Sequence, residues 1–206
     1  SGGIVPMSDE HLLETGLGGE WLHQGSFLNL RRDHVRLPDG GSATRDYVIH
    51  PGAVAIVALL DDGRVVLERQ FRYPVGKVML EIPAGKIDAG EPGLQCGMRE
   101  LLEETGYTAR EWAFAAKVHN AAAYSTEIIE IWFARGLSAG PQQLDAGEFI
   151  ELCLMDAAEI DARAAAGDIS DVKTLVGLLW LQKWRAGLWP LQWSAAPAQR
   201  TEIIAR

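Results

Sequence analysis

Three glutamates, Glu100, Glu103 and Glu104, are spaced so that one helix would carry them on one side. The sequence predicts a helix over residues 92–105, and at 3.6 residues per turn the three side chains fall within about 100° of arc, opposite much of the apolar stripe. Like charges three or four residues apart each cost roughly 0.2–0.5 kcal/mol, and the negative C-terminal end of the helix dipole adds to that penalty. We therefore expect a cation to compensate this acidic patch.

Arg99 precedes the patch and can pair with Glu103 one helical turn later. One guanidinium does not neutralise all the carboxylates, because Glu91 near the helix start adds a fourth. Mg²⁺ prefers oxygen ligands and keeps waters and substrate phosphates in its shell. The chemistry indicated is metal-assisted phosphoanhydride cleavage, in which metals neutralise phosphates, orient the leaving group and activate a water. Solvated surface glutamates are the alternative, and they are the better interpretation of the helix taken alone.

A longer pattern surrounds these glutamates. Its fixed positions are Gly85, Glu91, Arg99, Glu100, Leu101, Glu103, Glu104 and Gly106. Average frequencies of about 5–7% for the Gly, Glu and Arg positions make the chance of this spacing on the order of 10⁻⁸ per starting point. The pattern resembles the Nudix box and departs from it only at Tyr107, where an aliphatic residue is usual. The wider pattern therefore favours a metal site over a solvated helix surface.

The resemblance implies a fold and a set of site residues. It implies a Nudix-type α/β/α sandwich with a mixed sheet, preceded here by a small N-terminal antiparallel sheet. The expected metal ligands are Glu91, Glu100, Glu103, Glu104 and the backbone carbonyl of Ala84. The expected metal is Mg²⁺, with Mn²⁺ as a substitute. Arg99 is expected to orient the glutamates, and it joins Glu103 and Glu104 among the catalytic residues.

Two stretches upstream of the box, residues 68–75 and 80–88, resemble the ADP-ribose pyrophosphatase branch of the family. This likeness extends over roughly residues 20 to 185. It implies that Arg72 and Arg45 bind the diphosphate or the terminal ribose, because guanidinium forks suit phosphate oxygens. A surface ion pair is an equally good interpretation of each arginine.

Two further glutamates fall where the same branch has functional loops. Glu148 is expected to be catalytic, either as a general base or as a ligand of a further metal. Glu127 is expected to help shape the substrate site. An acidic loop before a strand and a strand-edge glutamate are the corresponding structural interpretations.

The implied reaction is Mg²⁺-dependent hydrolysis of a nucleoside diphosphate-sugar, with ADP-ribose giving AMP and ribose 5-phosphate. The loop at 118–127 lacks the proline that ADP-ribose enzymes often have shortly after the box. GDP-mannose, other nucleoside diphosphate-sugars and dinucleotides therefore remain alternative substrates. A non-catalytic module that senses nucleotide-sugars is an alternative of another class, but the box has lost none of its glutamates.

The elements that position this helix follow from the apolar pattern. A turn at 38–41 is expected between two antiparallel strands, and residues 53–60 and 65–71 are expected to form a hairpin. Further strands are expected at 128–134 and 149–155, and further helices at 157–166 and 172–185. Gly97 inside the first helix indicates close packing against the sheet.

Composition limits the partners and the organisation. The net charge of −9 disfavours nucleic acid or an anionic membrane as the main partner, and the two cysteines are expected to be reduced, which favours the cytoplasm. We expect an N-terminal sheet region over 1–50 that forms a homodimer, a Nudix domain over 51–190 and a tail over 191–206. Residues 1–3 are expected to be an expression remnant.

Overall fold

The computed structural model describes residues 8–197, so residues 1–3 and the end of the expected tail lie outside the described part. The described residues form two compact units. The first unit contains residues 8–50 and 121–127, and the second contains 51–120 and 128–197. The segment 121–127 thus belongs to the first unit although it follows the box in the sequence.

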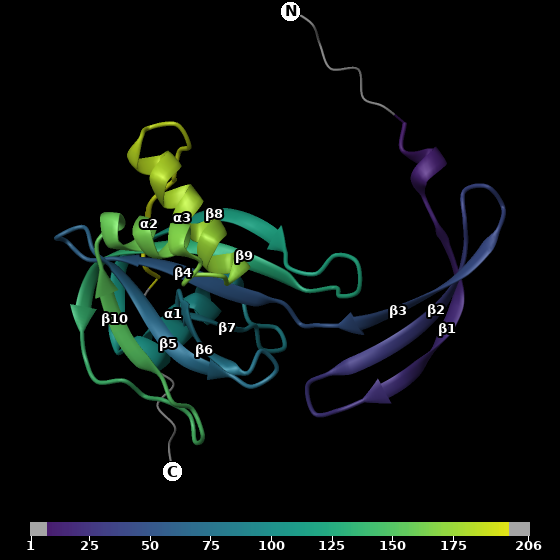
Figure 1. The fold of residues 1–206 in the computed structure, drawn as a ribbon, viewed down its shortest axis with the longest axis horizontal. Coiled ribbons are helices and arrows are strands. Elements are labelled where there is room, and N and C mark those ends of the chain that lie inside the picture. The colour runs from purple at the N-terminus through teal and green to yellow at the C-terminus, as the bar shows by residue number, and fades with distance from the viewer. Residues whose placement is uncertain (1–7, 198–206) are drawn as a thin grey trace, which may run out of the picture. The chain divides into compact units, whose positions relative to one another are not determined.

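The first unit is a three-stranded antiparallel sheet in the order β1-β2-β3 (Figure 1). Its elements are a short 3₁₀ helix Glu10–Leu12, β1 Thr15–Gln24, β2 Asn29–Arg36 and β3 Ser42–Ile49. The turn expected at 38–41 joins β2 to β3, and Gly40 takes a φ of 86° there. The expectation of two strands was incomplete, because β1 contains three glycines and its residues are all exposed, so it shows no apolar alternation.

The second unit is built on a mixed sheet in the order β10-β5-β4-β9-β8-β11, with β6 paired to β5 and β7 paired to β4. The strands are β4 Ala53–Leu59, β5 Val65–Arg72, β6 Lys77–Glu81, β7 Ala84–Lys86, β8 Tyr107–His119, β9 Ile128–Ala139, β10 Glu151–Met155 and β11 Ser194–Ala195. β4 and β9 run parallel, whereas β4 and β5 form the expected antiparallel hairpin.

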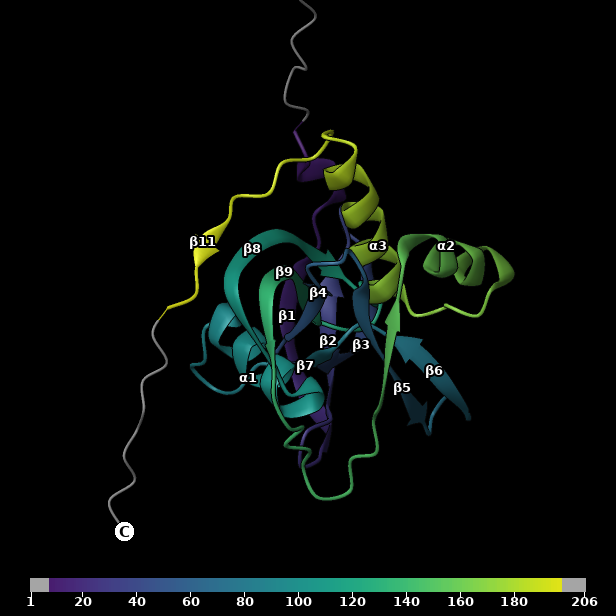
Figure 2. The ribbon, with the colours of Figure 1, turned by 90° about the vertical axis from the view of Figure 1, so that its left-hand side faces the viewer.

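Helices cover both faces of this sheet, as the expected α/β/α sandwich requires (Figure 2). α1 Gly93–Thr105 lies on one face, and α2 Ala157–Ala166 and α3 Val172–Arg185 lie on the other. β4 is buried along its whole length and serves both layers. Val54 and Ile56 pack in the cluster with α1, whereas Ala55 and Val57 pack in the cluster with α3. A strand buried on both faces explains why its sequence is a continuous apolar run.

The ends of α1 are set by the residues that the sequence indicated. Pro92 caps the N-terminus, and Gly106 ends the helix in the left-handed conformation with a φ of 72°. A Cβ at Gly97 would lie 3.2 Å from Val54 Cγ1 and 3.3 Å from a Trp112 ring carbon, so the expected close packing on the sheet is confirmed. α1 therefore packs closely against β4, and the close approach at Gly97 fixes its position on the sheet.

Candidate active site

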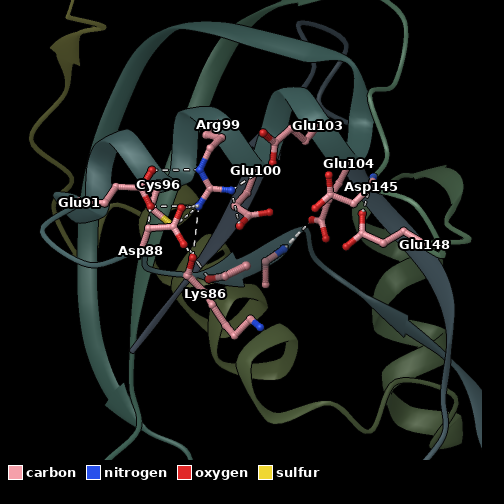
Figure 3. A network of polar contacts seen from close by, with 12 residues as sticks. Lys86, Asp88, Glu91, Cys96, Arg99, Glu100, Glu103, Glu104, Asp145 and Glu148 are labelled. Carbon is pink, nitrogen blue, oxygen red and sulfur yellow. Dashed lines mark hydrogen bonds and ion pairs between the residues drawn. The ribbon is translucent and has the colours of Figure 1, made fainter. Parts of the chain in front are cut away.

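A single guanidinium holds three of the box glutamates (Figure 3). Arg99 Nε donates to Glu91 at 3.0 Å, while its Nη1 donates to Glu100 at 2.8 Å and to Glu103 at 3.0 Å. We call these four residues the Arg99 cluster. The hydrogen bonds from Arg99 lower the pKa of Glu91. Arg99 thus contacts the glutamates that it was expected to orient.

The loop before α1 closes on the same carboxylates. A Cβ at Gly85 would lie only 1.9 Å from Glu100 Cδ and 2.0 Å from Glu100 Oε1. The first glycine of the box is therefore required for Glu100 to approach the backbone of β7. The neighbouring Ala84 N–H donates to Glu104 Oε2 at 3.0 Å, which places Ala84 beside an expected ligand. In β7, Ala84 thus bonds to Glu104, and Gly85 leaves room for Glu100.

Glu104 is buried, which corrects the expectation that the three helix glutamates lie together away from the core. Its exposed fraction is 5%, because the final turn of α1 brings Glu104 and Thr105 inward while Glu103 stays partly exposed. Burial, and then the charges of Glu68 and Glu100, raise the pKa of Glu104 to about 9. Glu104 is therefore the glutamate of the box that most needs a cation.

Glu68 on β5 is a member of this acidic group that the sequence did not single out as a site residue. It is fully buried, and burial followed by the charge of Glu81 raises the pKa of Glu68 to about 8. Gln70 donates to its Oε1 at 2.8 Å, but its Oε2 has no hydrogen-bond partner among the described residues. The signal available in the sequence was an acidic residue directly after the buried apolar run of residues 65–67.

Glu148 lies in the loop before β10, next to Glu104 on the side away from Glu91 (Figure 3). Burial is the largest cause of the raised pKa of Glu100 and of Glu104, and the charge of Glu148 adds a smaller contribution to both. Its Oε2 accepts a hydrogen bond from the Asp145 N–H at 3.1 Å, which holds the loop in a tight turn. The expected catalytic glutamate is therefore close enough to act on the same site electrostatically.

The expected substrate-binding residues fall in different units. Arg72 ends β5 in the second unit and donates to Glu81 through Nε and Nη2, both at 2.9 Å. Arg45 belongs to the first unit, where its Nε lies 3.0 Å from Glu14. Glu127 also belongs to the first unit, with Oε1 at 3.6 Å from His50 Nε2. The structure thus brings Arg72 into the acidic group and describes Arg45 and Glu127 in the first unit.

The chemistry of the donor set fits a hard divalent cation. Glu100, Glu104 and Glu148 offer only oxygen, and burial and mutual charge raise the pKa of Glu100 and Glu104, which a nearby cation would reverse. Within residues 8–197, however, no three His, Cys, Asp or Glu side chains already converge as a ligand shell. Glu100 instead points to Arg99, so metal binding at this site requires its carboxylate to turn.

Comparison with known proteins agrees with this geometry. The NUDIX domain family matches residues 49–175, and the nucleoside diphosphate sugar hydrolase N-terminal domain family matches residues 14–48. The ADP-ribose pyrophosphatase of Bacillus subtilis (strain 168) is 33% identical over 83% of this chain and 94% of its own. The methanol dehydrogenase activator of Bacillus methanolicus is 34% identical over 79% of this chain and 89% of its own.

A solved structure described as an ADP compounds hydrolase shares the fold. It superposes with a TM-score of 0.77 at 23% identity, covering 85% of this chain and 96% of that one. The first family match includes the whole Arg99 cluster together with Glu68, Ala84, Glu104 and Glu148. The chain therefore belongs to the NUDIX family and is a Nudix hydrolase.

Proposed function

We propose that the chain hydrolyses the pyrophosphate bond of a nucleoside diphosphate-sugar, converting ADP-ribose and water into AMP and ribose 5-phosphate in the presence of Mg²⁺. Mn²⁺ is the expected substitute metal. The observation that carries this proposal is the acidic group around α1. Glu104 is buried and Glu100 is partly buried, and burial raises the pKa of both carboxyl groups although Arg99 donates a hydrogen bond to Glu100. The similarity to an ADP-ribose pyrophosphatase over nearly all of that relative supports the substrate class.

Each site residue has a role in the proposed reaction. The metal would be held by Glu100 and Glu104, with Glu91, Glu103 and the Ala84 carbonyl close by. When bound, it supplies charge neutralisation of the diphosphate and activation of the attacking water. Glu148 accepts the proton of that water as the phosphoanhydride bond breaks. Arg99 keeps the carboxylates of its cluster in place.

The arginines would bind the anionic part of the substrate. Arg72 and Arg45 have guanidinium forks suited to phosphate oxygens, and we assign the diphosphate or the terminal ribose to them. Glu127, at the end of the segment 121–127, would help to shape the sugar site. GDP-mannose and other nucleoside diphosphate-sugars remain the alternative substrates. One relative of similar identity is named a methanol dehydrogenase activator, so relatives of this chain are not all named for ADP-ribose.

A substrate panel tests the proposal directly. We expect ADP-ribose to be hydrolysed to AMP and ribose 5-phosphate with Mg²⁺, and to be hydrolysed faster than GDP-mannose or dinucleotides. Glu103→Gln and Glu104→Gln are expected to lose activity, whereas Glu159→Gln on α2, which removes an exposed pair with Arg163, is the control. Full turnover by both box variants would rule out the mechanism. If the protein bound members of the panel but hydrolysed none of them, the non-catalytic sensing module would be favoured.

We also propose that the chain is a homodimer through its N-terminal sheet, and that it works in the cytoplasm. Large apolar side chains are exposed on and near β1, namely Leu12, Leu13, Leu17, Trp21, Leu22, Phe27 and Leu28. Large apolar side chains exposed in one segment are the kind of surface that protein interfaces cover. A monomeric mass by light scattering would contradict the dimer. Within the described residues, none of the helices is long and apolar enough to cross a membrane.

A further inference from the structure

Arg72 is fixed at one edge of its guanidinium and open at the other. Its Nε and Nη2 both bond to Glu81, whose side chain is 1% exposed, while the Arg72 side chain is 39% exposed. This bidentate pair uses two of the five N–H donors, and among the described residues Nη1 has no hydrogen-bond partner. Three N–H donors of this partly exposed side chain are therefore not used by Glu81.

Glu81 has a second cation, Lys173, which comes from α3. The Lys173 ammonium bonds to Glu81 Oε2 and lies 3.1 Å from Asp171 Oδ1, with only 10% of its side chain exposed. Burial alone would raise the pKa of Glu81, but the bonds from Arg72 and Lys173 outweigh it and lower that pKa. Lys173 therefore helps to keep Glu81 ionised, which the charge-assisted pair with Arg72 requires.

The N-terminus of α3 also holds the backbone next to Glu81. Asp171 caps α3 by accepting from the Thr174 N–H at 3.0 Å and from its hydroxyl at 2.6 Å. The same Thr174 hydroxyl oxygen accepts from the Ile82 N–H at 2.9 Å. Because Ile82 lies two residues before Ala84, the start of α3 supports both Glu81 and β7, the strand that contains the first glycine of the box.

The position of Glu68 shows why such support is needed. Glu68 lies directly opposite Glu81 in the register of β5 and β6, so Arg72 has a second buried carboxyl group nearby. Glu68 has no lysine bonded to it, and its Oε2 is without a partner among the described residues. Arg72 and Lys173 both bond to Glu81 and not to Glu68, so of the two neighbouring glutamates Glu81 is the one whose pKa is lowered, and Lys173 supports the pair with Arg72.

We propose that Lys173 is a positioning residue for substrate binding: through Glu81 it aims Arg72 at the diphosphate of the nucleoside diphosphate-sugar. This inference rests on the proposed function. Lys173 itself does not touch the substrate, and its effect passes through two side chains. Lys173→Met is therefore expected to raise KM for ADP-ribose by about 10-fold, within the range typical of residues that support a site indirectly, with a much smaller change in kcat.

The test is a double-mutant cycle between Lys173 and Arg72, measured as KM and kcat for ADP-ribose with Mg²⁺. If Lys173 acts through Arg72, Lys173→Met has no further effect on KM in an Arg72→Ala background. Lys173→Arg keeps the charge and is expected to restore KM to within about 3-fold of the original. Lys77→Met is the matched control, because Lys77 also joins β6 to the start of α3, at 3.2 Å from the Ser170 hydroxyl, without contacting Glu81.

Melting temperatures separate positioning from folding. Should Lys173→Met fail to fold, Glu81→Gln replaces it in the same cycle, because it keeps the shape and removes the charge that holds Arg72. Equal rises in KM with and without Arg72, or an unchanged KM in Lys173→Met, would overturn the positioning role while leaving the hydrolase proposal intact. A chain that hydrolyses no member of the substrate panel would overturn both.

Discussion

Glutamates lie at both ends of the acidic site, but their pKa is lowered at one end and raised at the other. At one end, the Arg99 cluster surrounds a single guanidinium, and Arg99 lowers the pKa of Glu91. At the other end, Glu104 and Glu68 are buried, no cation within residues 8–197 is bonded to either, and the pKa of each is raised. We call this second end the Glu68–Glu104 end. Residue type is the same at both ends, so the difference comes from partners and burial.

Glu100 connects the two ends. It accepts a hydrogen bond from Arg99 at 2.8 Å, yet burial raises its pKa, and Glu148 and Glu103 add to that rise. A cation placed between Glu100 and Glu104 would therefore offset the repulsion between these two carboxylates, which the bond from Arg99 to Glu100 leaves in place. The comparison teaches that the demand for a metal is concentrated at the Glu68–Glu104 end and is weak in the Arg99 cluster.

The largest expected effect comes from removing one carboxylate at each end. Glu104→Gln is expected to lower kcat/KM by more than about 100-fold, exceeding the 10–100-fold that indirect supporters of a metal site usually give. Glu91→Gln is expected to cost about 10-fold, because Arg99 still holds Glu100 and Glu103. Steady-state kinetics with Mg²⁺ measure both, and equal losses would contradict the asymmetry between the two ends.

A glycine substitution probes the position of Glu100. Gly85→Ala is expected to lower kcat/KM by about 10-fold or more, because the added Cβ would force the Glu100 carboxylate away from β7. Gly93→Ala is the matched control, since its Cβ would also meet a glutamate, with Glu130 Oε2 at 1.9 Å, but on β9 outside the expected ligands. A loss of activity in the control alone would show that α1 packing, and not Glu100, is sensitive.

The sequence predicted the parts of this site that depend on local spacing. α2 and α3 have the expected boundaries, and α1 begins one residue inside its expected range, because caps and glycines act within a few residues of the helix ends. The box spacing likewise predicted that Arg99 and the glutamates of its cluster lie together. Local periodicity is sufficient for such features.

The parts that the sequence missed depend on contacts between distant segments. β8 was not expected, and its packing follows from pairing with β9 and β11. The hydrogen bond from the Ala84 N–H to Glu104 joins residues 20 positions apart, and the bond between Glu81 and Lys173 joins residues 92 positions apart. Periodicity within one helix does not report such partners.

In the absence of metal, the free energy of unfolding is expected to depend on pH because Glu68 and Glu104 have raised pKa values. Their raised pKa values, about 8 and about 9, mean that between about pH 5 and pH 8 the folded chain keeps protons that the unfolded chain releases. The free energy of unfolding therefore falls as pH rises across that window, by at most about 1.4 kcal/mol per pH unit for each group.

Glu68→Gln tests that slope. The variant keeps a neutral side chain at every pH, so its unfolding free energy is expected to fall less steeply above pH 5 and to exceed that of the parent at pH 8. Urea titrations at several pH values, in the presence of a chelator, measure this. Identical slopes for Glu68→Gln and the parent would show that Glu68 is ionised in the folded chain.

The smallest expected effect is at the Arg99 cluster, where the cation is already supplied. Arg99→Lys keeps the charge but loses the fork that reaches Glu91, Glu100 and Glu103 at once, so we expect a loss of about 1 kcal/mol in unfolding free energy. The matched control is Arg163→Lys on α2, where one exposed pair with Glu159 is expected to contribute less than about 0.5 kcal/mol. If Arg99→Lys cost no more than this control, the shape of the guanidinium would not matter in the cluster, and its charge alone would explain why a metal is less needed there than at the Glu68–Glu104 end.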